Sequence, residues 1–272
     1  MSVKTTRVIV VALLLAGLSA QARADYTGSD PWKFRLSLYG WAPDISGEAT
    51  LHALNSDLSV SVAPNEYLPH LNSVFKGAFE VRKGRWGAFT DLVYMDLAKE
   101  VAQSRDITFG GLPLPVSANA NVDYALQSTI WSLAGIYNTV HSSEWELDAL
   151  LGFRYIDLRQ DVTWNISGDM GDTALFGRSG EAAGRLSNLD GIIGLRGRYA
   201  FGEQHRWFMP FYLDVGTGDS KLTTQIAAGL GYAFDWGEIS ANWRNLHYEM
   251  PSGMSVRDMD FNGPSLDFTL SW

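Results

Sequence analysis

Hydrophobic and polar residues alternate with a period of two along most of this chain. Such alternation places one set of side chains on each face of an extended strand. Each alternating segment is long enough to cross a bilayer as a tilted strand of about 9–11 residues. The pattern therefore predicts an all-β protein with membrane-spanning strands. The segments are residues 33–43, 73–83, 86–97, 122–140, 145–158, 189–201, 206–215, 221–234, 238–248 and 265–272.

Residues 48–62 alternate in two short runs, which Asn55, Ser56 and Asp57 interrupt. This arrangement predicts a short hairpin. With the hairpin included, we expect about twelve strands in a transmembrane antiparallel up-and-down β-barrel, since bacterial barrels of one chain use even numbers. Ten strands is the alternative, if the hairpin folds off the wall.

Residues 263–272 alternate and end on Trp272. The last strand of a bacterial outer-membrane barrel characteristically ends on an aromatic residue. This segment therefore predicts location in the outer membrane, with outer-membrane lipid around the wall. Its resemblance to such last strands implies recognition by the barrel assembly machinery during biogenesis.

The first residues have the pattern of a secretory signal. Lys4 and Arg7 precede an apolar run from Val8 to Leu18, and small residues at Ala22 and Ala24 suit a signal peptidase. The run is shorter than the roughly 20 apolar residues of a spanning helix. We expect residues 1–24 to be a signal peptide and residues 25–272 to be the barrel domain.

Charge and cysteine content narrow the function classes. The formal net charge is -9, and removal of Lys4, Arg7 and Arg23 with the signal leaves 18 basic and 30 acidic residues. This acidic balance argues against nucleic acid as a partner. Cysteine is absent, so the chain has no disulfide and no thiolate metal site.

The connections between the predicted strands alternate in length. Barrels of this kind have short periplasmic turns and longer extracellular loops. Short turns are expected at residues 83–85, 141–144, 202–205 and 235–237, and long loops at residues 64–72, 98–121, 159–188 and 250–264. Five tryptophans lie on the short-turn side and predict a membrane-interface girdle. They are Trp86, Trp145, Trp207, Trp236 and Trp272.

Sorting each strand by face places charged residues of both signs in the lumen, where they are predicted to line a narrow or obstructed pore. For the strand from Trp86 to Leu97 the orientation stays open, because Asp91 shares a face with apolar residues. Residues 65–72 are either an inward-folded plug or an ordinary surface loop. The predicted pore-lining residues are Arg35, Lys76, Glu80, Arg82, Glu146, Asp148, Arg154, Arg196, Arg198, Asp214, Arg244 and Asp267.

Catalytic chemistry has little support in the sequence. His247 is followed by acidic residues and serines, but no Gly-x-Ser-x-Gly motif is present, and the five histidines show no ligand spacing. We therefore predict no catalytic, cofactor or metal site. The alternative is an outer-membrane enzyme acting on lipid or peptide at the extracellular rim, centred on His247. A third hypothesis is an adhesin or receptor that uses residues 98–121 and 159–188.

Four segments resemble a family of uncharacterised proteobacterial outer-membrane β-barrel proteins. They are residues 77–87, 91–97, 214–220 and 263–272. The resemblance implies a monomer-sized barrel in the Gram-negative cell envelope and carries no activity with it. The function expected from the sequence is therefore a narrow porin-like channel for small solutes or a structural barrel, with a monomer favoured.

Overall fold

The computed structural model describes residues 30–51, 56–102, 118–170, 173–252 and 256–272. The predicted signal peptide, residues 1–24, lies outside these ranges. The chain divides into Met1–Trp32 and Lys33–Trp272, and the second unit forms the barrel. In the ranges that the structure describes, no helix has the length and apolar character needed to cross a membrane.

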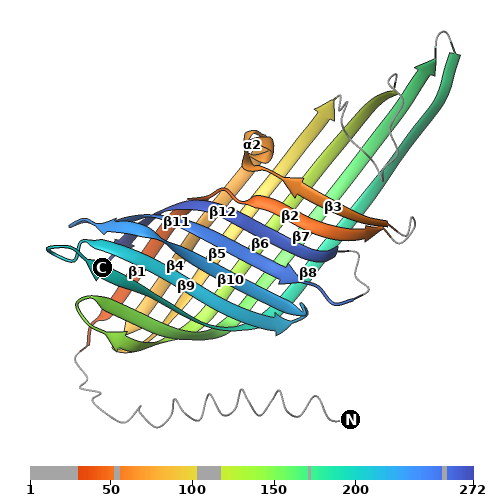
Figure 1. Ribbon diagram of the computed structural model, residues 1–272. Helices are drawn as coiled ribbons and strands as arrows, with labels where there is room; N and C mark the ends of the chain where they lie inside the picture. Colours follow the sequence, from red (N-terminus) through yellow and green to blue (C-terminus); the bar gives the residue numbers. More distant parts are fainter. Residues whose placement is uncertain (1–29, 52–55, 103–117, 171–172, 253–255) are drawn as a thin grey trace, which may run out of the picture. The chain divides into compact units, whose positions relative to one another are not determined.

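Ten strands close into a barrel, because each pairs with the next and the last pairs with the first (Figure 1). The closing pair runs antiparallel from Arg35 opposite Ser271 to Trp41 opposite Ser265. Closure leaves no open sheet edge within the hydrocarbon of a membrane. The strands of the barrel are β1 (Trp32–Trp41), β4 (Leu71–Lys83), β5 (Trp86–Ala102), β6 (Ala118–His141), β7 (Trp145–Met170), β8 (Thr173–Phe201), β9 (Trp207–Gly218), β10 (Leu222–Ala233), β11 (Glu238–Glu249) and β12 (Val256–Ser271).

Two further strands, β2 (Asp44–Leu51) and β3 (Ser56–Val62), form the predicted hairpin. β2 continues from β1 beyond Pro43 and pairs with the first half of β12, whose second half pairs with β1. Pro43 interrupts the ladder because it has no backbone N–H to donate. The twelve predicted strands are thus present, but ten of them close the barrel and the two strands of the hairpin lie outside it.

Strands β5 to β8 reach beyond the others (Figure 1). The expected long loop at residues 159–188 is wrong, since β7 and β8 stay paired from Leu158 opposite Leu186 to Met170 opposite Thr173. Residues 98–102 and 118–121 of the expected loop at residues 98–121 are likewise strand, and residues 103–117 lie outside the described ranges. Only residues 161–167 of this extension alternate, and glycines interrupt the pattern in residues 177–184, so the run was too short to predict the paired strands.

An apolar band surrounds the barrel. On β7 it runs from Trp145 to Tyr155 and on β8 from Leu189 to Tyr199. Eleven residues at about 3.3 Å per residue and a tilt near 40° span about 25 Å, the height of the apolar band of outer-membrane barrels. The large apolar side chains exposed in this band include Leu38, Phe75, Phe79, Leu151, Ile193, Leu195, Met209, Leu213, Val215, Ile226, Leu230, Leu266, Phe268 and Leu270.

The five girdle tryptophans lie at the short-turn end of the barrel, where Trp86, Trp145 and Trp207 begin β5, β7 and β9. Trp236 and Trp272 are the other two, and all five tryptophan side chains are between 45% and 63% exposed. Trp86 packs on Tyr137 and Trp145 on Tyr199, each with ring centroids 4.7 Å apart. Exposed aromatic rings at one end of an apolar band are typical of a membrane interface.

Two short helical turns, α2 (Pro64–Tyr67) and η1 (Leu68–His70), connect β3 to β4 at the end opposite the short turns. Tyr67 is 2% exposed and packs with Met95 and Leu97. Its hydroxyl donates to the carbonyl oxygen of Pro43 at 2.9 Å. The segment is therefore fixed over this end of the barrel by Tyr67.

Alkaline pH should loosen this segment. Burial, with the nearby Asp44 carboxylate, raises the pKa of Tyr67 from 10.0 to about 12. The stabilisation from the neutral phenol is complete below pH 10 and is lost as pH rises towards 12. We expect the unfolding free energy to fall over this window, measured by urea titration in vesicles. Tyr67→Phe should lack that part of the pH dependence and be less stable at pH 7 by about 1 kcal/mol.

Candidate functional site

The lumen is polar towards the short turns and apolar towards the other end. β11 shows the order, because its inward side chains are Glu238, Asn242 and Arg244 and then the fully buried Leu246 and Tyr248. The polarity of the inward face therefore changes along one strand. We describe the lumen as three layers in the same order.

The first layer surrounds a cavity of about 270 Å³ in the half of the lumen next to the short turns. Of the twelve residues predicted to line a pore, the three that do not line this cavity are Lys76, Arg154 and Asp214. The charged layer consists of four arginines and four carboxylates, so its formal charges balance. Its members are Arg35, Glu80, Arg82, Glu146, Asp148, Arg196, Arg198 and Glu238.

Ion pairs cross the lumen within the charged layer. Arg82 of β4 donates to both carboxylate oxygens of Asp148 on β7, at 3.0 and 2.6 Å. Arg35 of β1 and Arg198 of β8 approach Glu238 of β11 at 2.7 and 2.5 Å. Strands that are not neighbours in the wall are thus connected by charge-assisted hydrogen bonds, which neutralise the groups that an ion would meet.

Aromatic rings support two of these guanidinium groups. Arg196 binds Glu80 and lies 4.7 Å from the ring centroid of Phe89. Arg198 lies 4.1 Å from the ring of Phe208. A guanidinium over a ring face gains electrostatic attraction and loses rotational freedom. The arginines are therefore held in place around the cavity.

The middle layer holds two more ion pairs. Arg244 of β11 donates to Asp91 of β5 at 2.8 Å, and Tyr39 donates to the same carboxylate. Arg154 of β7 makes a two-pronged contact with Asp214 of β9, and neither side chain is exposed. The sequence left the orientation of Asp91 open. Its side chain points into the lumen, on the same face of β5 as Val93 and Met95, which are buried farther from the short turns.

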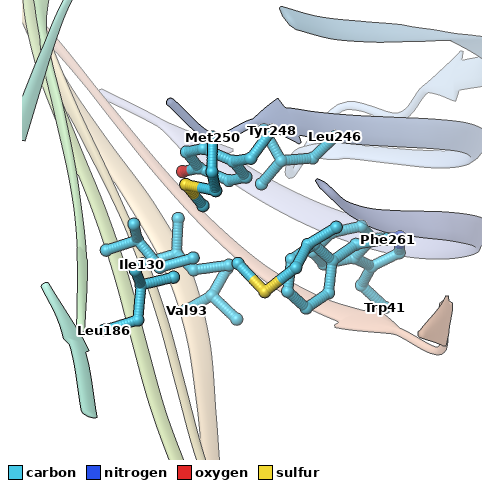
Figure 2. Close-up of a cluster of buried hydrophobic side chains, with 10 residues drawn as sticks. Trp41, Val93, Ile130, Leu186, Leu246, Tyr248, Met250 and Phe261 are labelled. Carbon is cyan, nitrogen blue, oxygen red and sulfur yellow. The ribbon is translucent and has the colours of Figure 1, made fainter. Parts of the chain in front are cut away.

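An apolar layer occupies the far part of the lumen. Figure 2 shows its side chains meeting from different parts of the wall, with Val93, Ile130 and Leu186 from β5, β6 and β8 approaching Trp41 and Tyr248 from β1 and β11. β6 and β11 are not neighbours in the sheet, so this contact spans the lumen. The layer consists of Trp41, Val93, Ile130, Ile156, Leu186, Leu246, Tyr248, Met250, Met259 and Phe261.

Sequence reasoning missed this layer, although a signal exists. Leu246 and Tyr248 share a face with Arg244 in the alternation of β11, while the opposite face carries Asn245 and His247. At the edge of the apolar band, the apolar side chains of β11 therefore change from the lipid-facing side of the strand to the side that faces the lumen. A sorting rule that places every apolar face in lipid cannot detect such a change.

Lys76 lies apart from the charged layer. Its ammonium donates to the carbonyl oxygen of Trp41 and sits 5.9 Å from the indole ring. Beside it, residues of β1 and β4 including Leu38 and Phe75 line a mostly apolar cleft in the wall. Lys76 therefore satisfies a backbone acceptor where β1 leads into the hairpin.

His247 and Asp260 form a pair outside the lumen. Nδ1 of His247 lies 2.9 Å from Oδ1 of Asp260, on neighbouring strands, and Thr224 stands opposite His247 on β10. Both paired side chains are about one-third exposed. Across the described ranges, no group of three or more histidine, aspartate or glutamate side chains is placed to hold a metal ion.

No family model and no curated protein sequence matches the chain. The fold is similar to the outer-membrane protease OmpT of Escherichia coli, with 10% identity, coverage of 92% of this chain and 99% of that chain, and a TM-score of 0.49. The translocator domain of the autotransporter NalP of Neisseria meningitidis has 11% identity, coverage of 97% of both chains, and a TM-score of 0.41.

Ail, the attachment invasion locus protein of Yersinia pestis, has 9% identity, coverage of 89% of this chain and 99% of that chain, and a TM-score of 0.34. These likenesses transfer no activity. The closed barrel, its band of exposed apolar side chains and the aromatic residues at one end of that band lead to one conclusion. The chain is an outer-membrane β-barrel protein.

Proposed function

We propose that the protein is a structural outer-membrane barrel with a closed lumen, and not an open porin. The apolar layer carries this proposal, because its ten side chains meet across the lumen. A hydrated ion or sugar would have to give up its water to pass such a constriction. With its lumen closed, the barrel would act in the envelope through its lipid-facing wall and the surfaces at its two ends.

The strand number and the charged layer also support a closed lumen. Eight strands leave room only for side chains and sixteen leave an aqueous channel, so ten strands enclose a narrow lumen. Ion pairs such as Arg82 of β4 with Asp148 of β7 connect strands across that lumen. The predicted lumen residues would line the path of a solute that crosses the membrane only if the apolar layer moved. The five tryptophans are proposed to anchor the periplasmic interface in lipid.

Solute permeation tests this proposal. Liposomes that contain the refolded protein should swell in arabinose no faster than protein-free liposomes, whereas liposomes with a sixteen-stranded porin should swell rapidly. Folding is checked by the heat-dependent mobility of the barrel on gels. Swelling by a folded preparation at a porin-like rate would overturn the proposal.

The second candidate is an enzyme at the extracellular rim, which the 2.9 Å contact between His247 and Asp260 favours. An imidazole oriented by a carboxylate is the base of many hydrolases, and a hydroxyl on Thr224 stands opposite on the next strand. Lipid or peptide would be the substrate there. Hydrolysis by the wild type that disappears in His247→Ala would establish this function, and unchanged hydrolysis would remove it.

A further inference from the structure

Two arginines share one carboxylate on the outer face of β7 and β8. Nε of Arg159 lies 3.1 Å from one oxygen of Asp157, and Nη2 of Arg185 lies 2.7 Å from the other. The Tyr155 hydroxyl donates to Asp157 at 3.0 Å and accepts from Ser187. The carboxylate is 11% exposed, whereas the arginine side chains are 54% and 58% exposed.

These arginines lie just beyond the apolar band. Tyr155 stands opposite Leu189, which is half exposed, and the next outward pair is Asp157 with Ser187. One such step along a tilted strand raises a side chain by about 5 Å. The step leads away from the short turns, so both guanidinium groups lie at the level of the outer-leaflet headgroups.

The charge and geometry of this cluster suit a phosphate. One carboxylate balances one of the two guanidinium groups, so the cluster of Asp157, Arg159 and Arg185 keeps a charge of +1. Hydrogen bonding from Arg185 holds the pKa of Asp157 below its ordinary value, so the cluster stays intact near neutral pH. A guanidinium binds phosphate oxygens through two parallel N–H groups, and the exposed arginines have donors to spare.

Neighbouring acidic residues define the side from which an anion can approach. Asp161 and Glu181 lie on the same face farther from the band, and both are exposed. An anion placed there would be repelled, whereas one at the membrane side meets the arginines first. Across the barrel, the edge of the band at β11 and β12 is acidic, with Asp258 and Asp260 in the strand.

We infer that Arg159 and Arg185, held by Asp157, form a binding site for the monoester phosphate of an anionic outer-leaflet lipid headgroup, with its acyl chains along the apolar face of β7 and β8. The site does not depend on the closed lumen. Through one lipid contact at β7 and β8, the site fixes how deep the barrel sits in the membrane and how it is rotated about its own axis.

Thermal unfolding in vesicles tests this site. Adding phosphatidate to phosphatidylcholine vesicles should raise the unfolding midpoint of the wild-type protein by about 2–4 °C, because the lipid binds the folded barrel. Arg159→Gln combined with Arg185→Gln should lose this shift. Lys221→Gln is the matched control, since Lys221 is an exposed cation at the same end of the barrel, away from β7, and pairs with Glu249.

Asp157→Asn provides a second test, because it leaves both arginines in place but removes the group that orients them. The variant raises the charge of the cluster from +1 to +2, so attraction by charge alone would enlarge the phosphatidate shift, whereas loss of the orienting carboxylate should reduce the shift without abolishing folding. A shift larger than that of the wild type would contradict the positioning role of Asp157. An equal shift in the wild type and the double arginine variant would overturn the proposal. Inorganic phosphate that raises the midpoint in pure phosphatidylcholine as much as phosphatidate does would also overturn it, since the site would then be one for the free ion.

Discussion

Replacing Arg154 by methionine is expected to lower the free energy of unfolding by about 3–5 kcal/mol. Arg154 and Asp214 are both fully buried in the middle layer of the lumen. The variant leaves the Asp214 carboxylate without its cation, in surroundings where water cannot replace it. Urea unfolding in lipid vesicles, followed by tryptophan fluorescence, measures the loss.

Two further variants separate the stability lost by leaving a buried charge unpaired from the stability lost with the packing of the arginine side chain. Arg154→Met combined with Asp214→Leu removes both charges, and its stability should return to within about 1 kcal/mol of the wild type. Arg206→Met removes a guanidinium that also pairs with an aspartate, Asp235, but at the exposed short-turn end, and it should cost less than about 1 kcal/mol. A single variant no less stable than the double variant would contradict this explanation.

Removing the aromatic side chains of the apolar layer is expected to make a silent barrel conduct ions. Trp41→Ala, Tyr248→Ala and Phe261→Ala together delete three rings that meet in the layer; those of Trp41 and Phe261 lie 6.3 Å apart. Water can then enter where it was excluded, and the polar layers below already hold a cavity. Planar-bilayer recording should show small steps for this triple variant.

A control with the same chemistry comes from the lipid face of the same strands. Trp243→Ala and Phe268→Ala remove exposed aromatic side chains from β11 and β12 without touching the lumen. This variant should remain silent. If the triple variant folds, as its gel mobility shows, and also remains silent, the apolar layer is not what closes the lumen.

The alternation along the chain predicted the barrel well because each spanning strand has one face in lipid. The charged residues could be assigned to the lumen for the same reason, as Arg82 and Asp148 illustrate. The hairpin was recognisable from the interruption at Asn55, Ser56 and Asp57, but its departure from the wall depends on the pairing of β2 with the outer half of β12. That pairing joins distant parts of the chain and leaves no local pattern.

The apolar layer in the lumen could not be predicted from alternation alone. Val93 and Ile130 look like lipid-facing residues until the register between β5 and β6 places them inside. Asp91 was ambiguous because it lies where the polar and apolar parts of the lumen meet on one strand. The extension of β7 and β8 was missed although Val162, Trp164 and Ile166 alternate with polar residues, because this run is short and glycines interrupt the pattern in residues 177–184.

Single-channel recording of the refolded wild-type protein in a planar bilayer tests the closed lumen most directly. Arg196→Ala combined with Arg198→Ala is recorded in parallel, because these changes widen the charged layer and leave the apolar layer intact. The closed lumen predicts no conductance steps from either protein. Stable steps from the wild type, with a conductance altered by the two arginine changes, would contradict it and establish an open pore through the charged layer.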